Sequence, residues 1–144
     1  MRIIRLIAGC GLALFFAGAA VAAQGNLLVG TWTTTLNPDT RAQLYLTATF
    51  APDGGLRERI MNRQGLALDY FGTYRFDSAQ GVLRYTWRDY APKEVCTPSV
   101  GCLGLPAPPF RLGIEETSRI AFQNPNFMIG RAADGSVLGW LRMN

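Results

Sequence analysis

The amino-acid sequence predicts an all-β protein, an antiparallel up-and-down barrel of eight strands. From residue 27 onward, short runs of alternating apolar and polar side chains are separated by turn residues, which is the pattern of successive β-strands. No window in this part of the chain combines a helical period with helix caps. All connections but one are short, so consecutive strands are expected to pair, and closure would protect their edges. A β-sandwich is the alternative architecture.

The first 23 residues have the order of a secretory signal peptide. Arg2 and Arg5 precede an uncharged apolar run over residues 6–21, and small residues allow cleavage after Ala22 or Ala23. We therefore expect residues 1–23 to be removed and residues 24–144 to form one domain. The expected location is the periplasm; secretion, or anchoring by an uncleaved N-terminal segment, is the alternative.

Three strands are expected before residue 62. Residues 27–36 are rich in β-branched and aromatic side chains, and the strand ends at Asn37-Pro38-Asp39 because proline cannot continue the ladder. Residues 43–51 alternate cleanly between apolar and polar side chains. Pro52-Asp53-Gly54-Gly55 has the composition of a turn and leads into a polar strand at residues 56–61.

The next two strands carry most of the aromatic side chains. Residues 66–77 place Tyr70 and Tyr74 on one face, and a turn at residues 78–81 separates this run from residues 82–90. On the second of these strands Tyr85 and Trp87 share a face. We expect both aromatic faces to point inward.

The pattern breaks at residues 91–112, which hold five of the eight prolines and two cysteines. This segment is expected to be a long loop without sustained alternation. Strands resume at residues 113–123, 126–133 and 136–143, and Asp134-Gly135 is a strong signal for a two-residue hairpin between the last two.

Cys96 and Cys102 are the cysteines that remain after signal removal, and an even number in an exported chain favours a disulfide. A disulfide here would pin the loop at residues 91–112. The chain contains no histidine, and these two thiols have no further thiol partner, so we expect no metal and no cofactor.

The strand pattern resembles that of the lipocalins, and more closely that of short lipocalin-like domains of exported bacterial proteins. The resemblance rests on Gly30-Thr31-Trp32 in the first strand, eight strands in order and a hairpin close to the C-terminus. It implies that Trp32 lies at the closed end of the barrel with an arginine from a late strand packed over it. Arg142 is the first candidate for this arginine, and Arg131 is the second.

The residue types argue against several classes of function. Without histidine, the chain has no Ser-His-Asp or Cys-His arrangement, and Glu115 and Glu116 should face opposite ways on a strand. Asp69 and Asp89 are expected to be solvated or paired with arginines of the neighbouring strands: Arg75, Arg84 or Arg88. After signal removal, 12 basic side chains face 10 acidic ones, which gives no reason to expect nucleic-acid binding. We expect a protein that is not an enzyme.

The candidate ligand-binding residues are the inward aromatic side chains and one arginine, which shares a face with Phe127 and Ile129. These residues are Trp32, Tyr70, Tyr74, Tyr85, Trp87 and Arg131. Aromatic side chains can line a cavity for a small apolar or amphipathic ligand, or they can fill the barrel. A filled core is slightly favoured at this point.

The resulting expectation is a monomeric exported barrel that binds a small hydrophobic or amphipathic ligand. The alternative is a protein-binding module, such as an inhibitor, that reaches an envelope partner through the loop between Cys96 and Cys102. Elsewhere in the segment at residues 91–112, Leu103, Leu105 and Phe110 are candidates to cover one end of the barrel.

Overall fold

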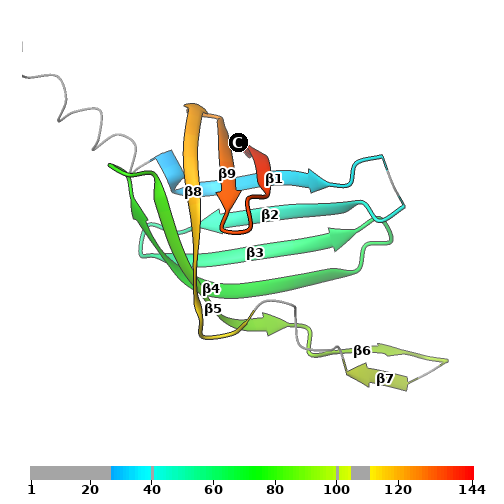
Figure 1. Ribbon diagram of the computed structural model, residues 1–144. Helices are drawn as coiled ribbons and strands as arrows, with labels where there is room; N and C mark the ends of the chain where they lie inside the picture. Colours follow the sequence, from blue (N-terminus) through cyan, green and yellow to red (C-terminus); the bar gives the residue numbers. More distant parts are fainter. Residues whose placement is uncertain (1–26, 40, 100, 105–110) are drawn as a thin grey trace, which may run out of the picture.

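The computed structural model shows a closed eight-stranded antiparallel barrel with one additional hairpin (Figure 1). It describes residues 27–39, 41–99, 101–104 and 111–144. The predicted signal peptide at residues 1–23 lies outside this part. Within the described ranges, no helix has the length and apolar character needed to cross a membrane.

The barrel follows the up-and-down order: each barrel strand pairs with the next barrel strand along the chain, and the last pairs with the first. The barrel strands are β1 (Gly30–Leu36), β2 (Leu44–Phe50), β3 (Gly55–Asn62), β4 (Ala67–Asp77), β5 (Val82–Ala91), β8 (Glu115–Asn124), β9 (Phe127–Ala132) and β10 (Val137–Arg142). All eight correspond to predicted strands, so the predicted fold class is confirmed.

The segment at residues 91–112 differs from the prediction of an irregular loop. It contains two short antiparallel strands, β6 (Glu94–Thr97) and β7 (Gly101–Gly104), which pair Cys96 with Cys102. The disulfide between these cysteines is present and joins the two strands. The sequence pattern missed the hairpin because nearly all its side chains are exposed, so neither face needs to be apolar.

One end of the barrel is closed by contacts around Trp32, whose side chain is fully buried. Its indole Nε1 donates a hydrogen bond to the carbonyl of Leu28, at 2.9 Å. The guanidinium carbon of Arg142 lies 4.3 Å from the centre of the Trp32 ring. The same guanidinium donates hydrogen bonds to the carbonyls of Val29, Leu27 and Pro125. Arg142 therefore ties the last strand to the segment that enters the first.

The geometry explains why glycine precedes Trp32 by two residues. Gly30 has a φ of 131°, a conformation that side chains disfavour. A β-carbon at this position would lie 2.6 Å from Nη1 of Arg142. Gly30 thus leaves room for the guanidinium over the Trp32 ring.

A second glycine permits close packing between β4 and β5. The register between these strands shifts between Phe71 and Gly72. A β-carbon at Gly72 would lie 2.3 Å from the carbonyl oxygen of Thr86 and 3.1 Å from the Trp87 ring. The absence of a side chain at Gly72 therefore lets Thr86 and the Trp87 ring approach the backbone of β4 closely.

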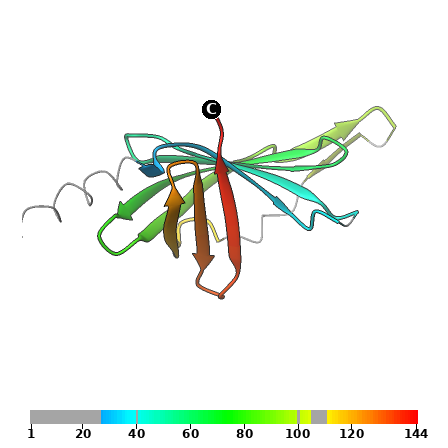
Figure 2. The ribbon, with the colours of Figure 1, turned by 90° about the horizontal axis from the view of Figure 1, so that it is seen from above.

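The opposite end of the barrel carries the longer connections. β1 begins at the Trp32 end and finishes at Leu36, so the β1–β2 connection lies at the other end. The connection after β5 also leaves from there, and Figures 1 and 2 show the β6–β7 hairpin projecting away from the barrel. Leu103, a predicted cover for the barrel, is 60% exposed, while Leu105 and Phe110 lie outside the described residues.

We predict that Arg142→Ala lowers the free energy of unfolding by about 2–4 kcal/mol, because it removes charge-assisted hydrogen bonds and the cation–π contact together. Urea unfolding followed by tryptophan fluorescence measures this change. Arg131→Ala is the matched control, since Arg131 is exposed on β9 and should change the stability by less than about 0.5 kcal/mol. Equal effects of the two substitutions would contradict the closing role of Arg142.

Candidate functional site

The interior of the barrel holds a cavity of about 250 Å³. Its wall comes from seven of the barrel strands and the β9–β10 turn, and it reaches Leu36 and Ser136 at the end opposite Trp32. Most lining side chains are apolar. Four polar side chains interrupt this wall: Glu58, Tyr85, Ser118 and Ser136. The slightly favoured expectation of a filled core is therefore wrong, and the small side chain of Ala132 is one of those that line the space.

Two of the predicted ligand-binding residues line this cavity, namely Tyr85 and Trp87 on β5. Their rings contact each other at 5.6 Å between centroids. Phe50 on β2 and Trp140 on β10, which were not predicted to bind a ligand, also line the cavity. The cavity thus has aromatic side chains from three separate strands.

Three other predicted residues serve the surrounding core instead. Trp32 belongs to the closed end, as described above. Tyr70 is buried behind the cavity and packs against the Trp87 ring, at 5.8 Å between centroids. Tyr74 donates a hydrogen bond from its hydroxyl to the carbonyl of Ala51, at 2.8 Å, and so fastens the β2–β3 turn. None of the three lines the cavity.

Arg131 is the predicted residue that the structure places on the wrong side. Met128, Gly130 and Ala132 line the cavity, so the alternation of β9 turns Arg131 outward, where it is exposed. The prediction grouped Arg131 with Phe127 and Ile129 correctly but assigned that face to the interior. Arg131 therefore supplies no positive charge to the cavity.

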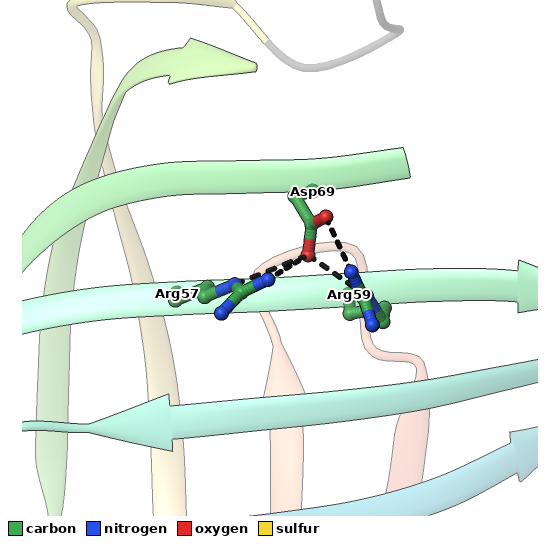
Figure 3. Close-up of polar contacts among 3 residues, drawn as sticks. All are labelled: Arg57, Arg59 and Asp69. Carbon is green, nitrogen blue, oxygen red and sulfur yellow. Dashed lines mark hydrogen bonds and ion pairs between the residues drawn. The ribbon is translucent and has the colours of Figure 1, made fainter. Parts of the chain in front are cut away.

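The charges of β3 are divided between the two sides of the barrel wall. Arg57 and Arg59 face outward and both pair with Asp69 on β4, with nitrogen–oxygen distances of 3.0 and 2.9 Å (Figure 3). Hydrogen bonding from Arg59 is the main cause that lowers the pKa of Asp69. Glu58 lies between these arginines in the sequence but faces the cavity. Asp69, the outer carboxylate, therefore has two cationic partners. Glu58, the inner carboxylate, lies on the opposite face of β3 from both arginines.

This pairing corrects the predicted partners of the outer carboxylates. Asp69 pairs with the arginines of β3, and Asp89 pairs with Lys93, at 2.6 Å. Arg75 and Arg84 instead approach Glu115, which faces outward while Glu116 faces inward. The predicted opposite orientation of the two adjacent glutamates is therefore confirmed.

The interior around Glu58 is poor in compensating charge. Burial, together with the nearby like charge of Glu116, raises the pKa of Glu58 from 4.5 to about 7. In the part of the chain that the structure describes, no arginine or lysine forms an ion pair with either carboxylate. Glu58 is thus an acid inside a largely apolar cavity, poised to change charge near neutral pH.

Tyr85 connects the second inner carboxylate to the cavity. Its hydroxyl donates a hydrogen bond to Oε2 of Glu116, at 3.1 Å. Burial raises the pKa of Tyr85 to about 12, and Glu116 adds to this rise, while a hydrogen bond with Ser118 opposes it. The tyrosine therefore remains a neutral hydrogen-bond donor over the physiological range of pH.

The sequence contained a signal for Glu58 that the analysis did not use. Leu56, Glu58 and Ile60 share a face by strand alternation, and two of the three are apolar. A single carboxylate on an apolar face marks a buried acid. Its relation to Glu116, which is 58 residues away, depends on barrel closure and had no local signal.

The disulfide hairpin offers one group of potential metal ligands, formed by Glu94, Cys96 and Cys102. All three residues are exposed, and both sulfur atoms are committed to the disulfide. A thiolate is the form of cysteine that binds metal. The oxidised hairpin therefore does not provide a metal site of this kind.

The comparisons with known proteins add no assignment, since neither a protein-family model nor a curated protein matches the chain.

We predict that Glu58→Gln stabilises the protein at pH 8 and has little effect at pH 4.5 or below. The folded-state pKa is raised, so the fold retains the proton of Glu58 between pH 4.5 and about 7, and stability falls as pH rises through this window. The gain at pH 8 should reach at most about 3 kcal/mol. Urea unfolding at the two pH values measures it.

The control for this comparison is Glu115→Gln, which removes a carboxylate from the outer face of β8. It should not reproduce the pH-dependent gain. A Glu58→Gln effect of the same size at both pH values would show that burial does not disfavour the charged form of Glu58.

Proposed function

We propose that the protein is an exported lipocalin-like carrier that binds a small amphipathic ligand in the barrel cavity. The observation that carries this proposal is the combination of a hollow, largely apolar interior with a few polar groups on its wall. Ligand pockets commonly have this composition, in which apolar walls supply affinity and polar groups fix orientation. The G-x-W strand and the packing of Arg142 over Trp32 support the lipocalin-like assignment.

The volume limits the size of the ligand. The cavity of about 250 Å³ exceeds the roughly 150 Å³ that accommodates benzene in an engineered core. It lies just below the range of about 300–1,000 Å³ for drug-sized ligands. By proportion, a ligand with on the order of ten non-hydrogen atoms fits the space.

Native mass spectrometry tests carriage directly. The protein is purified without detergent from the envelope fraction of cells that express the full chain, and its native and denatured masses are compared. A carrier is expected to show additional mass that disappears on denaturation. A bare native mass, combined with no uptake of 1-octanol in the titration below, would reject the proposal.

We predict that Ala132→Phe weakens the binding of 1-octanol by about tenfold or more, because the larger side chain occupies the cavity. The change in fluorescence of Trp87 and Trp140, which both line the cavity, reports binding. Ala121→Phe is the matched control, since Ala121 faces outward on the adjacent strand. Equal binding by both variants would place the 1-octanol site outside the barrel.

The projecting hairpin favours a second candidate function, that of a protein-binding module. Both strands of the hairpin are largely exposed, and the disulfide between Cys96 and Cys102 fixes their pairing. Preorganisation of this kind lowers the entropy cost of binding a partner. An envelope partner held through this hairpin would remain bound to Ala132→Phe and would be released when the disulfide is reduced.

A further inference from the structure

The charges inside the barrel have one sign. Glu58 lines the cavity, and Glu116 occupies the same inward face of β8 as Ser118 and Ile120. Among the residues that the structure describes, the arginines of the barrel wall face outward, apart from Arg142 at the closed end. A carboxylate taken out of water without a cation is unfavourable. The described residues therefore provide no cation to compensate the carboxylates inside the barrel, and a positively charged ligand could do so.

The negative charge of the interior discriminates between amphipathic ligands with anionic, neutral and cationic head groups. An anionic head group would meet the carboxylate of Glu58 on the cavity wall, with Glu116 close behind it, so repulsion would oppose its entry. A neutral head group would leave Glu58 without a cationic partner. A protonated amine would supply the missing charge and donate hydrogen bonds to the carboxylate.

The aromatic wall suits an organic cation as well. Tyr85 and Trp87 on β5 and Trp140 on β10 line the cavity. The faces of aromatic rings attract ammonium groups, and tryptophan does so most strongly. A bare divalent ion is a poorer match, because Ca²⁺ and Mg²⁺ require about six or more oxygen ligands and the wall is largely apolar.

We infer that the cavity selects a small organic cation, an apolar body that carries a protonated amine seated against Glu58 and Glu116. This inference rests on the proposed function and names the ligand class of the same site. Ser118 and the hydroxyl of Tyr85 add neutral hydrogen-bonding groups beside the carboxylates.

Binding should depend on pH through Glu58. The titratable groups that face it are Glu116 on β8, Tyr70 on β4 and Tyr85 on β5, while its partner on β2 is Ala48. Burial raises the pKa of both tyrosines, so they stay protonated. A bound ammonium favours ionised Glu58, so binding at pH 7 should release about half a proton, and affinity should fall as the pH is lowered below about 7.

Three probes with the same eight-carbon hydrocarbon chain test the inference: octylamine, 1-octanol and sodium octanoate. Each is titrated by calorimetry into protein expressed from the full-length sequence. Octylamine should bind at least about tenfold more tightly than the other two at pH 8. Repeating the octylamine titration at pH 7 in buffers of different ionisation enthalpy measures the released proton. Glu58→Gln should remove most of the preference for octylamine over 1-octanol, measured as the ratio of the two affinities, whereas Glu115→Gln should retain this preference.

Each adverse outcome has a distinct meaning. If 1-octanol or octanoate binds as tightly as octylamine, the inference is overturned and the carrier function stands. If no octyl compound binds, the inference is overturned, and a bare native mass then overturns the carrier function as well. If octylamine binds best but neither Glu58→Gln nor Glu116→Gln weakens it, the assignment to the inner carboxylates is wrong. These comparisons start with the wild-type protein, so a variant that fails to fold does not prevent the test.

Discussion

The contact on which the barrel depends is the guanidinium of Arg142 against the face of Trp32. The pairing of the first and last strands is short, with Trp32 opposite Arg142 and Thr33 opposite Leu141. Arg142 reinforces this seam because it also binds backbone carbonyls of the segment before β1. Since these carbonyls precede the first strand and Arg142 ends the last, one side chain joins the two ends of the sheet. Gly30 is part of the same arrangement, because any side chain there would displace the guanidinium.

Closure at one end leaves the other end free to be hollow. Trp32 and Leu28 are fully buried at the closed end, whereas Ala132 presents only a small side chain to the cavity near the other end. The wall also sorts charge by strand alternation. Arg57 and Arg59 pair with Asp69 on the outer face (Figure 3). Glu58, which lies between the two arginines in the sequence, faces inward. Adjacent residues of β3 therefore form ion pairs on the outer face and place an acid without a cationic partner on the inner face.

The fold could be predicted from the sequence because its signals are local. Alternation identifies each barrel strand, and Asp134-Gly135 identifies the final hairpin. The β6–β7 hairpin had no such signal, since its strands bury little and the disulfide fixes their pairing. For the site, the aromatic face of β5 was predicted, but the grouping of Arg131 with Phe127 did not tell which face of β9 points inward. The juxtaposition of Glu58 and Glu116 could not be predicted, because it requires the register of the closed barrel.

Glu58 is an acid held in a hollow, largely apolar interior, and no cation among the described residues pairs with it. A carbon-detected NMR titration of the glutamate side-chain carboxyls, with Glu58 assigned through the spectrum of Glu58→Gln, tests this environment. We expect Glu58 to titrate with a pKa of about 7. Titration of Glu58 near its ordinary value of 4.5 would contradict this expectation, because the carboxylate would then be solvated or paired with a cation.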